Sequence, residues 1–242
     1  MLRPPPAEYS AIHQRLKRRE VLEHLQAFLS PLQLTRRVQV RVEECGAETR
    51  PYRPGGAVTI CYEYIARIEA LAPPAKTPEG VLREDMIAGA FVQVMLHEFA
   101  HAVFDILQVP LLGREEDAAD KLAAFIMLQF GKEVALPTLS GAAWFFEASK
   151  RTWTGSDFSD VSGTEQQRFY NYLCIAHGAD PRLFAPLLRN TLLKTHRAAN
   201  CTSEYSDLQF AFNSTIMRHV DPDLLKKVQQ TQWLRPDDGK GI

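Results

Sequence analysis

Hydrophobic residues near the start of the chain recur at the spacing of an α-helix. Between residues 7 and 29, apolar positions are separated mostly by three to five residues, with Arg and Lys among the residues between them. The apolar positions are Ile12, Leu16, Val21, Leu22, Leu25 and Leu29. This pattern predicts one amphipathic helix, which the Ser30-Pro31 pair should end.

The hydrophobic period then changes to two. Val38, Val40 and Val42 alternate with polar residues, and residues 57–62 repeat the alternation after the turn cluster Arg53-Pro-Gly-Gly56. Such alternation is typical of strands that bury one face. We therefore expect the two segments to form a small antiparallel hairpin.

The rest of the chain has the pattern of helices. Residues 82–108 are apolar nearly all round, which predicts a central buried helix rather than a surface one. Ser140 is a suitable N-cap for a later helix, and Gly178 a suitable terminator of another. Helices are expected at residues 62–71, 82–108, 115–130, 140–151, 164–177, 181–195 and 202–220 and shortly after Pro222, with an exposed loop at 152–163.

No linker divides the chain convincingly, so we expect a single domain over residues 1–242. Its fold class is mainly α (α+β), with a small N-terminal hairpin and a central helix packed among others. We expect four parts: an N-terminal helix at 1–34, the hairpin and short helix at 35–72, central helices at 80–132 and a helical part at 137–242.

Composition narrows the function classes. The chain has 242 residues, 45% of them hydrophobic and 24% charged, which is ordinary for a globular protein. A net charge of −1 argues against a nucleic-acid partner. The most apolar stretch, 86–107, is interrupted by His97, Glu98 and His101, so we expect a soluble protein without a membrane span. No nucleotide-binding or serine-hydrolase motif is present.

The four cysteines allow two interpretations, two disulfides or four reduced thiols. Cys45 and Cys61, and Cys174 and Cys201, are close enough in sequence for two local disulfides, the first of which could join the two strands near one end. Two disulfides would indicate an oxidising compartment, whereas four reduced thiols would suit the cytoplasm. The first residues contain no apolar segment of the signal-peptide type, so a leader is either not used or has been removed.

The most informative residues lie within the central predicted helix. His97-Glu98-Phe-Ala-His101 is an H-E-x-x-H motif. Its two histidines share one helix face and can converge on one Zn²⁺, while Glu98 can reach a water molecule beside the metal. On a buried helix these polar groups would be costly without a common partner. We therefore predict one zinc ion per chain, in preference to a structural His/Glu network.

A third ligand is expected from the next helix. Glu116 and Asp120 are four residues apart and share a face, so Glu116 can complete the metal site. Asp120 can then accept a hydrogen bond from the free ring nitrogen of a zinc histidine. Glu115 is the competing ligand. The simpler alternative is that these acids only stabilise the start of a helix.

These two motifs resemble those of the gluzincin metallopeptidases, in which Glu-x-x-x-Asp follows H-E-x-x-H. Over residues 35–210 the chain is also similar to a bacterial family of metallopeptidases of otherwise unknown function. The further matching segments are Cys45-Gly46, Thr59-Ile-Cys-Tyr-Glu63, Gln167-Arg-Phe-Tyr-Asn171, Cys174, Gly178-Ala-Asp-Pro181, Arg197 and Cys201. The resemblance implies a zincin-like core, zinc on His97, His101 and Glu116, and Glu98 as base. It also implies disulfides and export, which would place the protein outside the cytoplasm.

The expected activity is hydrolysis of a peptide or protein substrate. Glu98 would take a proton from zinc-activated water and pass it to the leaving amine. The oxyanion needs a further donor, for which the candidates are Tyr170, His177, Arg168, Tyr205 and His196. The strand at 57–62 could bind an extended peptide at its edge. The alternatives are a non-catalytic zinc-binding or interaction module and a hydrolase of non-peptide amides.

Overall fold

The computed structural model describes residues 1–47, 49–152, 154, 159–188 and 195–231. The chain is mainly helical with a small two-stranded sheet, which confirms the predicted α+β class. In chain order the elements are η1 (Ala7–Tyr9), α1 (Ser10–Arg18), α2 (Val21–Leu29), β1 (Val40–Glu43), β2 (Val58–Cys61), α3 (Tyr62–Leu71), α4 (Arg83–Leu107), α5 (Glu115–Leu128), α6 (Lys132–Ser149), α7 (Glu165–Ala179), α8 (Ala185–Leu188), α9 (Thr195–Thr215), η3 (Met217–His219) and α10 (Pro222–Gln230).

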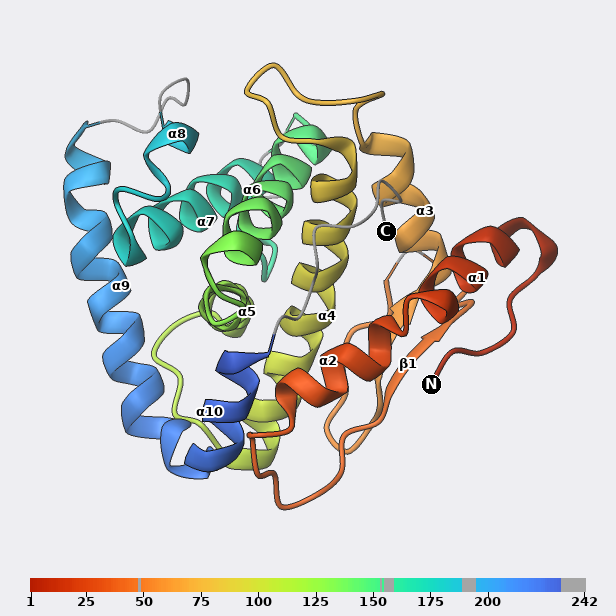
Figure 1. Ribbon diagram of the computed structural model, residues 1–242, viewed down its shortest axis with the longest axis horizontal. Coiled ribbons are helices and arrows are strands. Elements are labelled where there is room, and N and C mark those ends of the chain that lie inside the picture. The colour runs from red at the N-terminus through yellow and green to blue at the C-terminus, as the bar shows by residue number, and fades with distance from the viewer. Residues whose placement is uncertain (48, 153, 155–158, 189–194, 232–242) are drawn as a thin grey trace.

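Helix α4 is the centre of the molecule. It packs against α5 and α6 on one side and against β2 and α3 on the other, while α7 and α9 form an outer layer (Figure 1). By length and composition alone α4 could cross a membrane, but 83% of its most apolar stretch is buried inside the protein. Its hydrophobic residues therefore face a protein core on nearly all sides, as their distribution around the helix predicted.

Two glycines bring α4 and α6 into close contact. A Cβ atom added at Gly141 would lie 1.8 Å from the backbone oxygen of Asp85, and one added at Gly89 would lie 2.2 Å from that of Thr138. No other residue type fits at these positions without moving a helix backbone.

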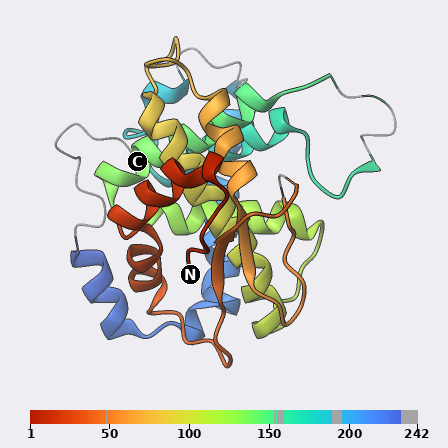
Figure 2. The ribbon, with the colours of Figure 1, turned by 90° about the vertical axis from the view of Figure 1, so that its right-hand side faces the viewer.

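The two strands are parallel, so the prediction of an antiparallel hairpin was wrong. Val40 pairs with Val58 and Glu43 with Cys61, and the two strands lie side by side in Figure 2. Residues 44–57 return the chain to the start of β2, which is the long connection that parallel neighbours require. Residue Leu2 forms a parallel bridge to Val42 on the other edge of β1.

The helix predicted over residues 7–29 is broken at Glu20, whose φ of 48° is left-handed. Leu16 and Leu25 are both buried, yet nine residues in one straight helix would place them on opposite faces. The break turns α2 relative to α1, so both apolar faces reach the core.

Other helix boundaries also differ from the sequence-based ones. Helix α6 begins at Lys132 rather than at Ser140, because its first turns bury Val134 and Ala135 in the core, although Pro137 cannot donate a backbone hydrogen bond within the helix. Ser140 is buried within the helix and donates to the carbonyl of Leu136. Gly178 lies inside α7, where it contacts the backbone of Cys201 in α9. The helix expected at 181–195 is described only as α8, and residues 189–194 lie outside the described residues.

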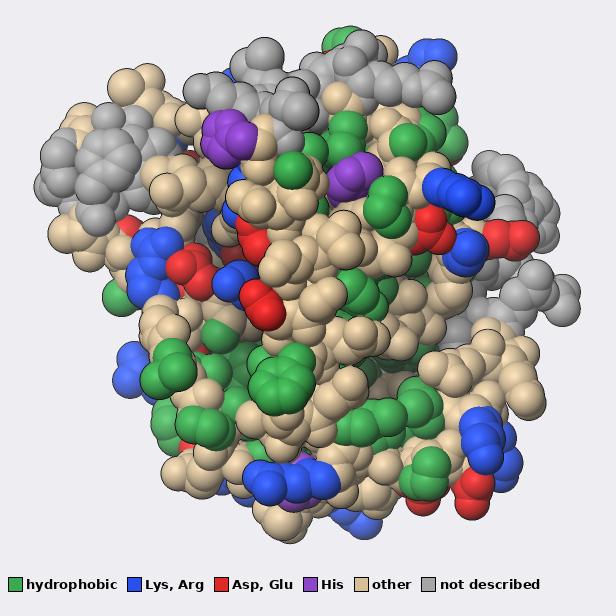
Figure 3. Space-filling view, turned by 90° about the vertical axis from the view of Figure 1, so that its left-hand side faces the viewer, with side chains coloured by type: hydrophobic (Ala, Val, Ile, Leu, Met, Phe, Trp, Pro, Cys, Tyr) green, Lys and Arg blue, Asp and Glu red, His purple; other side chains and the backbone are tan. Residues whose placement is uncertain are grey.

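Both predicted disulfides are present in the described chain. Cys45–Cys61 links the carboxyl ends of β1 and β2, and Cys174–Cys201 links α7 to α9. The side of the molecule on which α9 lies carries hydrophobic side chains among charged ones (Figure 3). The disulfide joins α9 covalently to α7, against which α9 also packs.

Candidate metal site

A row of polar residues runs along the otherwise apolar helix α4. Gln93, His97, His101 and Asp105 follow one another at intervals of four residues, so they lie on one side of the helix. Helix α5 begins beside this row after a short turn and brings Glu115, Glu116 and Asp120 to it. The site is thus built from two helices that pack together.

Three side chains converge at the middle of this row. The Nε2 atoms of His97 and His101 lie 3.3 Å apart. Glu116 places one carboxylate oxygen 3.1 Å from His97 Nε2 and the other 3.5 Å from His101 Nε2. Donors of a tetrahedral zinc, bound at about 2.0–2.1 Å, are spaced by about 3.3 Å. The donor set therefore fits a zinc ion.

Each histidine has a carboxylate on its other ring nitrogen. His97 Nδ1 lies 2.9 Å from Asp120, and His101 Nδ1 lies 2.7 Å from Glu115. A carboxylate only accepts, so both Nδ1 atoms donate, and a ring in its neutral form then carries its lone pair on Nε2, the nitrogen that faces Glu116 or the other histidine. With both rings neutral, three acceptors meet at one point, and a metal ion could be held there. Glu115, which the sequence offered as the competing ligand, is bound to Nδ1 of His101 and not to the Nε2 atom that faces His97.

Asp120 is the most strongly held of these carboxylates. Arg168 of α7 binds both of its oxygens at 2.7 Å, and Gln93 donates to it from 3.2 Å. The guanidinium also stacks on the ring of Phe146 at 4.2 Å. Burial alone would raise the pKa of Asp120, but the charge of Arg168 and the hydrogen bond with His97 outweigh it and hold the pKa well below its usual value.

The carboxylates of Asp120 and Glu116 favour positive charge on His97. Burial by itself would lower the pKa of His97, but hydrogen bonds to Asp120 and Glu116 outweigh it and raise the pKa to about 9. The hydrogen bond with His97 in turn lowers the pKa of Glu116. The cluster is therefore electrostatically suited to a cation.

Glu98 lies next to the cluster on the same helix. Its Oε2 atom accepts a hydrogen bond from the backbone N–H of Tyr52 at 2.9 Å. Burial raises the pKa of Glu98, although nearby His97 and the Tyr52 amide oppose the shift. A carboxylate with a raised pKa is a more effective proton acceptor for neutral-pH chemistry.

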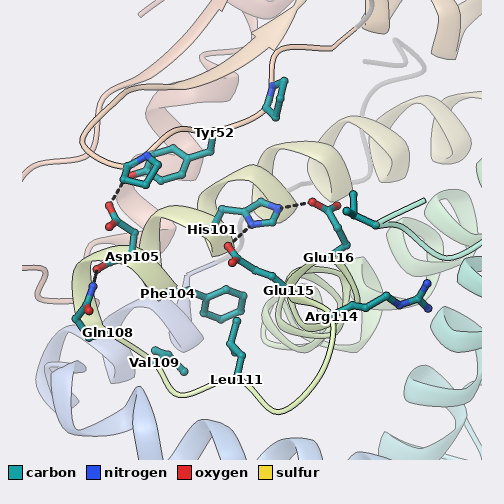
Figure 4. A pocket seen from close by; sticks show the side chains of 13 residues that line it. Tyr52, His101, Phe104, Asp105, Gln108, Val109, Leu111, Arg114, Glu115 and Glu116 are labelled. Atoms are coloured by element: carbon teal, nitrogen blue, oxygen red, sulfur yellow. Dashed lines mark hydrogen bonds and ion pairs between the residues drawn. The ribbon is translucent and has the colours of Figure 1, made fainter. Parts of the chain in front are cut away.

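An open groove of about 720 Å³ adjoins His101 and Glu116. Figure 4 shows its floor on α4, with Tyr52 on one side and the start of α5 on the other. Its lining is largely apolar around the metal-site residues. The apolar lining residues are Pro51, Tyr52, Pro54, Phe104, Val109, Leu111 and Val161.

The structure does not bring the other predicted donors to this groove. Tyr170 packs against Phe169 with ring centroids 5.0 Å apart, and Tyr205 lines a separate pocket beneath α9. His177 lies nine residues beyond Arg168 on α7, which is about 13 Å along a helix. Arg168 itself directs its Nε and Nη2 groups to Asp120. His196 is exposed in α9.

Several contributors to the site were missed in the sequence. Gln93 and Asp105 could have been found, because they continue the four-residue spacing of His97 and His101 on an apolar helix. The Tyr52 amide could not, because a backbone donor 46 residues from its acceptor leaves no sequence pattern.

A family model with the description "Putative metallopeptidase" matches residues 3–215. The chain belongs to this family, DUF4344. The resemblance to a family of metallopeptidases of otherwise unknown function is thereby confirmed. The description of this family indicates a general peptidase or metal-binding function and implies a metal ion. His97, His101 and Glu116 could hold such an ion. No curated protein and no solved structure matches the chain.

Proposed function

We propose that this DUF4344 protein is a zinc-dependent peptidase of the gluzincin type, with His97, His101 and Glu116 as ligands and Glu98 as general base. The observation that supports it best is the triangle of two Nε2 atoms and the Glu116 carboxylate, with sides of 3.1 to 3.5 Å. The carboxylates on both Nδ1 atoms support zinc over a purely structural network.

Zinc, when bound, supplies Lewis-acid chemistry: it makes water acidic enough to ionise near neutral pH and polarises an amide carbonyl. The protein's part is to place a base beside that water. Because Tyr52 occupies Oε2 of Glu98, Oε1 is the oxygen left to take the proton. Glu98 then delivers this proton to the leaving amine, so each turnover restores the carboxylate.

The open groove favours an extended peptide as substrate. Its apolar walls beside His101 suit an apolar side chain near the cleaved bond. The edge of β2 is less accessible. Thr49 and Arg50 lie beside it, and the crevice that they form with Thr59 and Glu98 has a volume of only about 10 Å³. We therefore place the peptide in the groove rather than on the strand.

Metal analysis combined with a peptide-library cleavage assay tests this function. We expect about one zinc per chain in the wild type and in Glu98→Gln, and loss of zinc in His101→Ala. Glu98→Gln should lower kcat by about 10²- to 10⁴-fold. Glu84→Ala is the matched control, since Glu84 is an exposed carboxylate on the same helix.

Two results would contradict the proposal. Cleavage that survives in Glu98→Gln would remove the proposed base. Zinc binding without turnover of any library peptide would instead favour a non-catalytic zinc-binding module.

A further inference from the structure

Residues 49–57, which we call the strap, lead into β2 and pass over the end of the row of polar residues on α4. The strap contributes Pro51, Tyr52 and Pro54 to the wall of the groove. At its other side Thr49 and Arg50 pack beside β2 and Glu98. The strap thus borders both the open groove and the small crevice beside Glu98.

Asp105 attaches the strap to α4. Its Oδ2 atom accepts from the Tyr52 hydroxyl at 2.8 Å and from the Gly55 N–H at 3.4 Å. Arg36 forms an ion pair with the same oxygen and donates to the Tyr52 hydroxyl at 3.0 Å. Figure 4 shows Tyr52 reaching down to Asp105, one helical turn beyond His101.

The strap also contacts Glu98, through the Tyr52 backbone. Tyr52 N–H donates to Glu98 Oε2 at 2.9 Å, so a single residue is bound to α4 by its side chain and to Glu98 by its amide. A free glutamate carboxylate rotates broadly about its last torsion. A hydrogen bond on one oxygen restricts that rotation and keeps the other in a defined direction.

We propose that Asp105 is a positioning residue for Glu98, acting through the strap and the Tyr52 amide. This inference rests on the proposed function of Glu98 as base. Helix α4 then carries the two histidines, Glu98 and Asp105 within nine residues. A catalytic group is most effective when neighbouring contacts fix its orientation, and here one rigid helix sets both the metal ligands and the strap.

Kinetics of Asp105→Ala test the proposal with the zinc-loaded enzyme. We expect kcat to fall by about 10- to 100-fold, more than KM changes, with zinc content unchanged. Asp105→Asn should recover part of this loss, because an amide oxygen still accepts from Tyr52 and Gly55. Tyr52→Phe should show an intermediate loss, since it removes the hydroxyl and keeps the amide. Glu84→Ala on the same helix should match the wild type.

A second readout does not depend on turnover. The chain contains 7 tyrosines, so ¹⁵N-tyrosine labelling gives few amide signals, and Tyr52→Phe identifies that of Tyr52. We expect exchange of this amide with solvent to be at least about tenfold faster in Asp105→Ala and in Glu98→Ala than in the wild type. Glu84→Ala should leave it unchanged.

The outcomes separate the two proposals. A wild type that cleaves no peptide would contradict the proposed function. An active wild type with equal kcat in Asp105→Ala, or unchanged exchange of the Tyr52 amide in that variant, would overturn the role of Asp105. Loss of zinc or of folding in Asp105→Ala, with no recovery in Asp105→Asn, would show a merely structural residue and would also overturn it.

Discussion

Asp120 is the residue that joins the most partners around the proposed metal ligands. It is only 6% exposed and is bound by His97, Gln93 and Arg168 together. A buried ion pair contributes little compared with an apolar pair, but removing one member leaves the other charge without compensation. Asp120 thereby links metal binding to the stability of the α4, α5 and α7 contacts.

Asp120→Ala should lower the free energy of unfolding by about 3–5 kcal/mol, because it leaves the Arg168 charge buried and unpaired. It should also weaken zinc binding about 10- to 100-fold through the freed His97 ring. Denaturant unfolding and zinc titration measure the two effects. The control is Asp117→Ala, whose ion pair with Arg114 is partly exposed and should contribute at most about 1 kcal/mol. Equal losses in both variants would contradict the argument.

The pH dependence of stability should reflect the same carboxylate. The pKa of Asp120 lies below its ordinary value of 3.8 in the folded protein, so between these two values the unfolded chain binds this proton and the folded protein does not. The stabilisation is complete above the unfolded pKa and is lost as the pH falls from there through the folded pKa. Unfolding measured below pH 4 should therefore show a steeper loss in the wild type than in Asp120→Asn. Parallel curves would contradict this.

At the scale of elements, the crossing of α4 and α6 positions the metal-site helix. Because Gly89 and Gly141 have no side chain, the two helix backbones lie closer together than a Cβ atom at either position would allow. The two histidines proposed as ligands lie two to three turns further along α4, so the crossing sets the direction from which His97 and His101 meet α5.

Gly141→Ala should be destabilising by about 1–3 kcal/mol or more, because the added methyl group meets the Asp85 backbone rather than a movable side chain. Thermal unfolding measures this. Gly163→Ala is a suitable comparison, since its nearest neighbours are side-chain atoms at 3.3 Å and beyond. A Gly141→Ala protein as stable as Gly163→Ala would show that the two helices can separate at little cost.

Parallel pairing of β1 and β2 was the main feature of the fold that sequence reasoning missed. Alternation of apolar residues marks a strand but does not indicate its direction relative to a neighbour. The cysteines held the missing information: Cys45 follows β1 and Cys61 ends β2, so their bond joins two carboxyl ends. In an antiparallel pair, the end of one strand would instead face the start of the other.

At the scale of the molecule, the two disulfides have different roles. Cys45–Cys61 closes the segment that contains the strap, while Cys174–Cys201 joins α7 to the outer helix α9. We propose that the protein works in an oxidising, extracytoplasmic compartment, where both bonds persist.

Replacing either cysteine pair with serine should lower stability by about 3 kcal/mol, since both bonds close loops of similar size. Only the Cys45→Ser/Cys61→Ser variant should also lose kcat, because it frees the strap beside Glu98. The Cys174→Ser/Cys201→Ser variant is its matched control. Four free thiols in the denatured, unreduced wild-type protein would contradict the prediction of disulfides and of the compartment.

The sequence by itself determined the features that depend on near neighbours along the chain. The burial of α4 and the placement of His97 and His101 on one face follow from helical periodicity. The start of α5 at the acidic cluster follows from the preference of acidic side chains for a helix N-terminus. Tertiary structure alone decided which carboxylate meets which ring nitrogen, that Arg168 binds Asp120 across 48 residues, and that the Tyr52 amide reaches Glu98. These contacts join segments whose relative position is set by packing of the whole core, and no local pattern encodes that packing.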